Sequence, residues 1–346
     1  MRFPKFFLML IAAVSVSCNS DDSGTAVVSG DYANGFLVLN EGGTGEVTYM
    51  SSDLATVEHD IFSGVNGSGQ DLGAFAQSMF FDGDRAFVIS NGSNKITVVN
   101  RYTFEYIASI DSGFQSPRYG VVSNGKAFVT NSNDFMSTTD DFISVVNLST
   151  LSVEGTITAN DQTEKITAHN GKIYVATGYF GVGDKIIVID AASEEIITKI
   201  TVPAAPNSLE VHNQTLFVLS GSFDGESSLS RIDINNNSVI SSTSFPSTMG
   251  NAVNLDIEDD FIYFTSSSKI YKFSVDVTAI SDTPLVDTQS PSFYMGYGFA
   301  VNANRIYISE AADDFASDGS VFIYGTDGSF IAEKSSGLGP NGFYFN

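Results

Sequence analysis

Few residues in this chain have the types and spacing that catalysis requires. Its 346 residues include three histidines, His59, His169 and His212, and no two of them have the spacing of zinc ligands. The sequence also lacks a phosphate-binding loop and the glycine-flanked serine of a nucleophile elbow. Adjacent acids such as Asp140 and Asp141 could serve a glycosidase, but such pairs are frequent in a chain with 40 acidic residues. We therefore expect a binding protein without catalytic residues.

Metal binding is the other chemistry that the residue types allow. Two polar segments offer several oxygen ligands each: Asn131, Asn133, Asp134 and Asp140 in one, and Asp313, Asp314 and Asp318 in the other. Carboxylate and amide oxygens are the ligands that Ca²⁺ prefers, although neither segment has EF-hand spacing. We expect no cofactor and no metal site, with structural calcium as the alternative.

The elements that must position these residues form a repeat. Residues 117–157 contain four short apolar runs, each bounded by Gly, Asn, Asp or Ser, and this pattern predicts four antiparallel strands. An aromatic residue marks the second strand of each copy: Phe36, Phe87, Phe128, Tyr174, Phe217, Tyr263 and Tyr307. From Phe87 onward the interval between these residues is 41 to 46 residues. Seven four-stranded copies at this period predict an all-β, seven-bladed β-propeller.

The two ends of the repeat predict how the ring closes. The copy that begins at Gly35 lacks a first strand, whereas residues 338–345 have a first-strand pattern with no further copy after them. The C-terminal strand is therefore expected to join the N-terminal blade, which leaves only short, protected sheet edges. Residues 34–346 should form this single propeller domain.

The connections predict two different faces. First-to-second and third-to-fourth strand turns are short and rich in Asn, Asp and Gly, whereas second-to-third strand loops and blade connections are longer and vary. The residues that enter each inner strand should approach a central funnel from the loop face: Gln77, Arg118, Lys165, Asn207, Asn251, Tyr297 and Asn341. Loop-face apolar side chains are unusually frequent: Phe135, Met136, Tyr179, Phe180, Phe223, Phe293, Tyr294 and Phe315. Aromatics among amides suit a large, partly apolar ligand with hydrogen-bonding groups.

The N-terminus has the features of an export signal. Arg2 and Lys5 precede an apolar run, and small residues lead to Cys18, which is the only cysteine. This arrangement resembles a bacterial lipoprotein signal, with residues 1–17 as signal peptide and Cys18 as the lipidated residue. An ordinary secretory signal is the alternative. Residues 18–33 should then be a flexible acidic tether. The formal net charge of −24 argues against nucleic-acid binding.

The repeat resembles the YncE-like, YVTN-type seven-bladed propellers over residues 34–346. The resemblance rests on an aromatic followed by Val in second strands such as Phe87-Val88, and on third strands such as ISVVN from Ile143. The opening FLVLNEG from Phe36 and the closing GPNGF from Gly339 resemble one branch of that family, the surface lipoproteins of Bacteroidetes that include BtuG-type proteins. BtuG-type proteins capture cobalamin and sit on a TonB-dependent outer-membrane transporter. The resemblance thus implies a lipid-anchored outer-membrane protein with a corrinoid-like ligand and such a transporter as partner.

A corrinoid carries many amide arms around an apolar macrocycle, so its site needs amide, Tyr and Arg groups beside flat rings. The candidate contacts on the loop face are Glu41, Asn91, Arg118, Tyr119, Asn131, Tyr179, Tyr294 and Tyr297. Stacking must come from Tyr or Phe, because the chain has no Trp. Two other classes stay open. One is a protein- or glycan-binding propeller used in adhesion or as a transporter accessory, and the other is an enzyme such as a lactonase or lyase.

Overall fold

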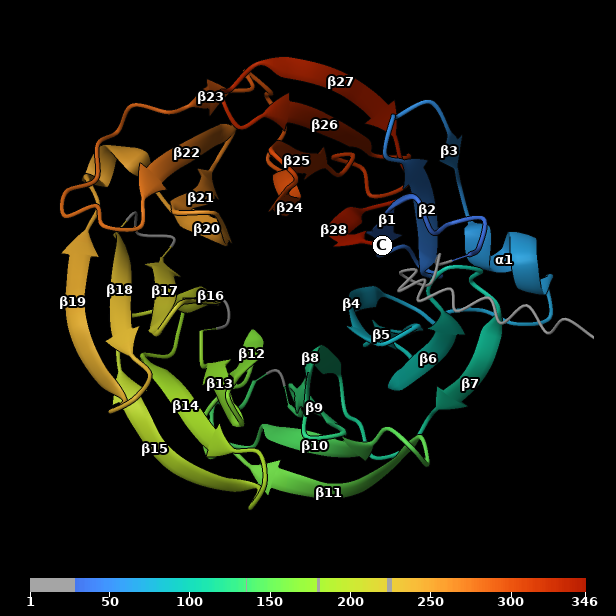
Figure 1. Ribbon diagram of the computed structural model, residues 1–346, viewed down its shortest axis with the longest axis horizontal. Coiled ribbons are helices and arrows are strands. Elements are labelled where there is room, and N and C mark those ends of the chain that lie inside the picture. The colour runs from blue at the N-terminus through green and yellow to red at the C-terminus, as the bar shows by residue number, and fades with distance from the viewer. Residues whose placement is uncertain (1–28, 135, 179–180, 223–225) are drawn as a thin grey trace, which may run out of the picture.

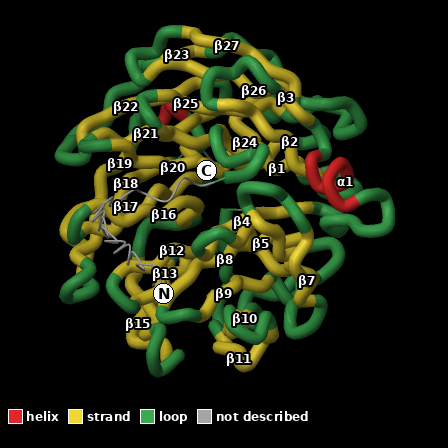
Figure 2. The backbone as a smooth tube through the Cα atoms, turned by 45° about the vertical axis from the view of Figure 1, so that its right-hand side comes forward, coloured by secondary structure: helices red, strands yellow, loops and turns green. Residues whose placement is uncertain are grey.

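The computed structural model describes residues 29–346 except 135, 179–180 and 223–225. Seven antiparallel sheets of four strands surround a central channel, as Figure 1 shows. This arrangement confirms the predicted all-β, seven-bladed propeller. Figure 2 shows the ring from an oblique direction, with most of the chain in strands and loops. Within these described residues, none of the helices has the length and apolar character needed to span a bilayer.

Each blade runs outward from the channel, with its first strand innermost. The first four blades are β28 (Pro340–Phe345), β1 (Gly35–Asn40), β2 (Glu46–Ser51) and β3 (Val57–Glu58); β4 (Ala76–Asp82), β5 (Arg85–Ser90), β6 (Lys95–Asn100) and β7 (Tyr106–Ile110); β8 (Pro117–Ser123), β9 (Lys126–Asn131), β10 (Phe142–Asn147) and β11 (Ser152–Thr158); and β12 (Ile166–His169), β13 (Lys172–Ala176), β14 (Lys185–Asp190) and β15 (Glu195–Thr201).

The remaining three blades follow the same order. They are β16 (Pro206–His212), β17 (Thr215–Gly221), β18 (Ser227–Asp233) and β19 (Ser238–Ser244); β20 (Ala252–Glu258), β21 (Phe261–Ser266), β22 (Lys269–Ser274) and β23 (Val286–Asp287); and β24 (Met295–Asn302), β25 (Arg305–Glu310), β26 (Ser320–Gly325) and β27 (Phe330–Ser335). A single 3₁₀ turn at Ser247–Met249 precedes β20.

Burial explains why the second and third strands give the strongest sequence signal. Both faces of a middle strand pack against neighbouring blades, so β5 and β9 are buried over nearly their whole length. All seven marker aromatics of the second strands are buried, and the core consists of seven clusters between adjacent blades. The outermost strands instead alternate exposed and partly buried residues, as in β11.

The ring closes as the sequence predicts. Strand β28 pairs antiparallel with β1, with Phe345 opposite Phe36 and Phe343 opposite Val38. The Tyr344 hydroxyl also accepts a hydrogen bond of 2.8 Å from the backbone N–H of Met79 in the second blade. The C-terminal strand therefore joins the first blade by its backbone and the second blade by a side chain.

Two features near the N-terminal blade differ from the sequence-based expectation. Tyr32, which the predicted tether included, is buried against Tyr49 and Phe104, so the packed domain begins before residue 34. A short helix, α1 (Ile61–Asn66), lies in the predicted connection to the second blade. The Asp60 side chain accepts the N–H of Ser63 and caps this helix. Six residues are too few to produce a helical hydrophobic period, so this helix could not be predicted from the sequence pattern.

Side chains on the inner strands tie neighbouring blades together around the channel. In three places a side-chain amide donates to a backbone carbonyl one blade ahead: Asn207 to Ala252 at 2.9 Å, Asn254 to Gly296 at 2.7 Å and Asn341 to Ala76 at 2.8 Å. The hydroxyl of Ser78 donates in the same way to the Arg118 carbonyl. These bonds fix where the strand ends lie, and the strand ends carry the candidate site.

Candidate functional site

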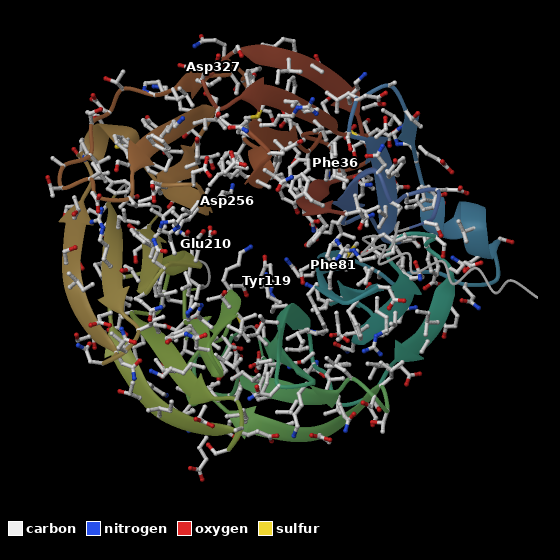
Figure 3. The ribbon with its side chains drawn as sticks, in the orientation of Figure 1. Phe36, Phe81, Tyr119, Glu210, Asp256 and Asp327 are labelled. Atoms are coloured by element: carbon white, nitrogen blue, oxygen red, sulfur yellow. The ribbon has the colours of Figure 1, made fainter. Side chains whose placement is uncertain are left out.

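The loop-face end of the channel widens into a cavity of about 690 Å³. This volume lies within the range of small-molecule sites, roughly 300–1,000 Å³. Side chains from every blade line it: Glu41, Phe75, Gln77, Asn91, Arg118, Tyr119, Lys165, Asn207, Ser208, Val253, Asn254, Tyr297, Phe299, Asn341, Phe343 and Tyr344. Figure 3 shows Tyr119 beside the central channel. The cavity confirms the predicted location of a funnel, at the entry to the inner strands.

One side of the cavity, which we call the polar wall, consists of Gln77, Arg118, Tyr119, Glu164 and Lys165. The guanidinium group of Arg118 binds the Glu164 carboxylate through two hydrogen bonds of 2.9 and 2.8 Å. Their side chains are only 13% and 9% exposed. A third guanidinium nitrogen donates to the Gln77 carbonyl at 2.6 Å, and the Gln77 amide donates to the Tyr119 hydroxyl at 3.1 Å. The polar wall is thus a connected and partly buried network.

On the other side Tyr297 lines the cavity, and we call Tyr297 and the two rings that pack against it, Tyr294 and Phe315, the aromatic wall. The rings of Tyr294 and Phe315 meet edge to face at 4.6 Å between centroids, and Phe315 lies 5.5 Å from Tyr297. The Tyr297 hydroxyl donates to the Glu41 carboxylate. Burial, followed by this hydrogen bond, raises the pKa of Tyr297, so the phenol remains a donor to Glu41 at physiological pH.

Five of the eight predicted contact residues line the cavity: Glu41, Asn91, Arg118, Tyr119 and Tyr297. Tyr294 stands behind the cavity surface, where its ring packs against Tyr297 at 6.2 Å between centroids. Tyr179 lies outside the described residues.

Asn131 occupies a different place from the other candidates. It is fully buried at the end of β9, where its amide donates to Val129 and Ser144 and its carbonyl accepts from Gln115. Asn40 does the same at the end of β1, where its amide donates within the blade to the Val38 carbonyl. Asn131 therefore holds its loop in place and does not contribute to the cavity surface.

Sequence reasoning placed one funnel residue wrongly and missed the ion-pair partner of another. Asn254, rather than Asn251, lines the cavity; it lies within β20 at a register irregularity between Val253 and Asp256, whereas Asn251 precedes the strand. Glu164, the ion-pair partner of Arg118, follows it by 46 residues, the interval that separates Phe128 from Tyr174. Opposite charges one repeat apart were the available signal for this pair.

Beyond the cavity, two carboxylates lie on adjacent inner strands, Glu210 on β16 and Asp256 on β20 (Figure 3). Each caps a backbone N–H of the next blade: Glu210 accepts from Ile257 at 2.8 Å, and Asp256 accepts from Val301 at 2.7 Å. Burial, followed by the charge of Asp256, raises the pKa of Glu210, and burial likewise raises the pKa of Asp256. The channel is therefore acidic below the cavity.

The candidate calcium segments use some of their oxygens in internal hydrogen bonds, while Asp140 Oδ1 is buried without a partner among the described residues. Asp140 accepts from the Asn133 amide at 2.9 Å, and Asp314 accepts from the backbone of Ala316 and Ser317. Among the residues that the structure describes, no group of three or more His, Cys, Asp or Glu side chains is arranged to hold a metal ion. Calcium stays a prediction, which thermal melts with calcium and with chelator would test.

Solved structures with similar folds support the architecture. A computationally designed protein, Ika8, has a TM-score of 0.59 at 10% identity, over 91% of each chain. Kuenenia stuttgartiensis hydrazine synthase has a TM-score of 0.54 at 16% identity, over 75% of this chain and 86% of that one. The dihydro-heme d1 dehydrogenase NirN, in complex with DHE, has a TM-score of 0.57 at 14% identity, over 92% and 76%. At these identities the likeness concerns the fold alone.

No curated protein matches the sequence. One family profile does, over residues 34–327, which includes both walls of the cavity. The chain therefore belongs to the family described as "Domain of unknown function (DUF5074)".

Proposed function

We propose that the funnel cavity captures a small molecule, and that this molecule is cobalamin or a related corrinoid. The observation that carries the proposal is the pairing of a hydrogen-bonding wall with an aromatic wall across one cavity of about 690 Å³. Pockets of this kind combine apolar surface with a few well-placed polar groups, which together set orientation and specificity. We expect a binding protein without catalytic activity.

The chemistry of a corrinoid fits these two walls. Its amide arms would pair with side chains such as Asn91, Gln77 and Asn207, and its flat, apolar macrocycle would lie against Tyr297. The cavity is open toward the loop face, so a ligand larger than the cavity could be seated with part of it outside. The three histidines give no reason to expect cobalt ligation by the protein, because none of them lines the cavity, and His169 and His212 lie at the far ends of inner strands β12 and β16.

The N-terminal sequence supports the outer membrane as the location where the ligand is captured. A lipid on Cys18 would anchor the propeller to the outer membrane, and the acidic run after it favours exposure at the cell surface. A TonB-dependent transporter is the partner that would receive a captured corrinoid.

Isothermal titration of the protein with cyanocobalamin and cobinamide tests the proposal. We expect one-to-one binding of cyanocobalamin, and a Tyr294→Ala variant should bind it more weakly because the aromatic wall loses a supporting ring. Phe330→Ala is the matched control, because this exposed ring lies on the outer strand β27, away from the cavity. Absence of heat with either compound, on protein shown to be folded, would reject the corrinoid.

A second candidate function is docking of a protein or glycan. The side chains of Met136 and Phe293 are 85% and 83% exposed, and both belong to loop-face connections. Exposed apolar side chains of this size suit a macromolecular surface better than a small ligand. Co-purification of outer-membrane proteins with the wild type but not with Phe293→Ser would favour this function.

A further inference from the structure

Lys165 is the lysine among the described residues that line the cavity. Its ammonium group lies 3.9 Å from the centroid of the Tyr119 ring, at the surface of the cavity. In the described part of the chain, no acidic side chain lies within ion-pair distance of it, whereas Lys126, Lys185 and Lys199 each contact a carboxylate. Among the described residues, Lys165 is thus a cavity lysine whose charge is not paired with a carboxylate.

The hydroxyl of Tyr119 adds a second donor at the same place. Its oxygen accepts from the Gln77 amide at 3.1 Å, so its own hydrogen is left for an acceptor in the cavity. Tyr297 differs, because its hydrogen is already donated to Glu41. The Glu164 carboxylate accepts two hydrogen bonds from Arg118, and among the described residues neither Lys165 nor Tyr119 donates to it.

We propose that Lys165 and the Tyr119 hydroxyl form an anion subsite, which binds a phosphate ester or carboxylate of the captured ligand. The inference deepens the proposed function and rests on the funnel being the ligand site. Tyr119 lies in β8 and Lys165 directly precedes the neighbouring inner strand β12, and the contact between Lys165 and the Tyr119 ring holds the ammonium group over the cavity. The ligand class is therefore amphipathic, with a flat apolar part for the aromatic wall and one oxyanion for the subsite.

The overall negative charge of the protein limits the places where an anion can bind. A protein with a net charge of −24 repels anions at long range, so an oxyanion is stabilised only where local donors outweigh that field. Arg118 is neutralised by Glu164, and Glu41 lies on the opposite wall, bonded to Tyr297. Among the described residues that line the cavity, Lys165 is therefore the cation without an acidic partner, and a ligand charge can pair with it.

The first experiment needs no corrinoid. Inorganic phosphate is added in place of chloride at constant ionic strength, while the ring signals of labelled tyrosines are followed by NMR, and acetate is titrated in parallel. We expect saturable shifts of the Tyr119 signals, lost in Lys165→Gln. The Lys272→Gln variant should retain them, because Lys272 also lies on aromatic rings, 4.3 Å from Phe261, but outside the cavity. If only phosphate gives saturable shifts, the subsite is specific for a phosphate ester. If acetate gives them as well, the subsite binds oxyanions in general.

The second experiment tests whether the subsite contributes to corrinoid binding. Cyanocobalamin carries a phosphodiester that cobinamide lacks, so the wild type should bind it more tightly. Lys165→Gln should weaken cyanocobalamin binding by about tenfold or more and leave cobinamide binding unchanged. Phosphate shifts without corrinoid binding would retain the subsite and reject the corrinoid. Absence of phosphate and acetate shifts in the wild type, or equal shifts in Lys165→Gln, would overturn the subsite even if corrinoids bind.

Discussion

Tyr119 and Tyr297 belong to opposite walls of one cavity, and their hydroxyl groups are in opposite hydrogen-bonding states. Tyr297 donates to Glu41, and its ring is supported by Phe315. Tyr119 accepts from Gln77, and its ring is covered by Lys165. In the aromatic wall the Tyr297 hydroxyl is thus satisfied within the protein and its ring is left for apolar contact, whereas in the polar wall the Tyr119 hydroxyl still has a hydrogen to donate to a ligand. The same residue type serves both functions, and its partners decide which.

The largest expected effect comes from breaking the ion pair behind the polar wall. Arg118→Ala should destabilise the protein by about 3 kcal/mol, because it leaves the Glu164 carboxylate partly buried without its partner. Urea denaturation measures this loss.

The double variant Arg118→Met with Glu164→Leu provides the matched control. It removes both charges and should recover most of the stability while ligand binding stays weak, because the network that holds Gln77 and Tyr119 is gone. A single Arg118→Ala variant as stable as the wild type would show that the polar wall is not held by this pair.

The aromatic wall should show the reverse balance of stability and binding. Tyr294→Ala should cost little stability, since this residue is only half-buried, but should weaken corrinoid binding by about tenfold through loss of ring packing behind Tyr297. Titration calorimetry beside a urea melt separates the two effects. Equal binding by Tyr294→Ala and the wild type would remove the aromatic wall from the ligand site.

The acidic pair below the cavity, Glu210 and Asp256, should make the stability of the protein depend on pH. The pKa values of Glu210 and Asp256 are raised in the folded protein, so the folded state holds protons that the unfolded chain has released near neutral pH. Their contribution to stability is therefore present at acid pH and is lost as pH rises. Glu210→Gln keeps an oxygen for the Ile257 N–H and should stabilise the protein at pH 8 by on the order of 1 kcal/mol, with little effect at pH 4.

Urea melts at several pH values test this sign. Asp327→Asn is a suitable control, because hydrogen bonds from Ser329 lower the pKa of this exposed carboxyl group, and its removal should not stabilise the protein at high pH. A Glu210→Gln variant that is less stable than the wild type at pH 8 would mean that the charged form is favoured in the channel.

The smallest expected effect is that of Lys165→Gln on stability. Its ammonium group is held by an aromatic ring at the cavity surface rather than by an ion pair, so the free energy of unfolding should change by no more than about 0.5 kcal/mol. Urea denaturation would show this change, and a loss above about 2 kcal/mol would indicate that Lys165 is a structural residue.

Much of the fold and part of the cavity could be predicted from the sequence. Blade number, strand positions and closure followed from the buried aromatics and turn residues, because burial on both faces forces a regular pattern on the middle strands. The funnel residues at Arg118 and Tyr297 followed from their place at strand entries. The burial of Asn131 did not, because an Asn that ends a strand and an Asn that lines a cavity have the same local sequence.

Partnerships across blades were the least predictable feature. Glu164 meets Arg118 only because the ring places equivalent positions of adjacent blades side by side. Asn254 lines the cavity in place of the predicted Asn251, and it lies at a backbone irregularity where its φ is 63°. Turn and strand propensities act within a few residues and contain no information about either feature.

Hydrogen–deuterium exchange with and without saturating cyanocobalamin tests most directly whether the two walls form one ligand site. We predict slower exchange in residues 116–120 of the polar wall and 293–298 of the aromatic wall, with no change in the turn at 123–126 on the opposite face. Protection confined to the outer strands, or no protection of either wall, would contradict capture in the funnel.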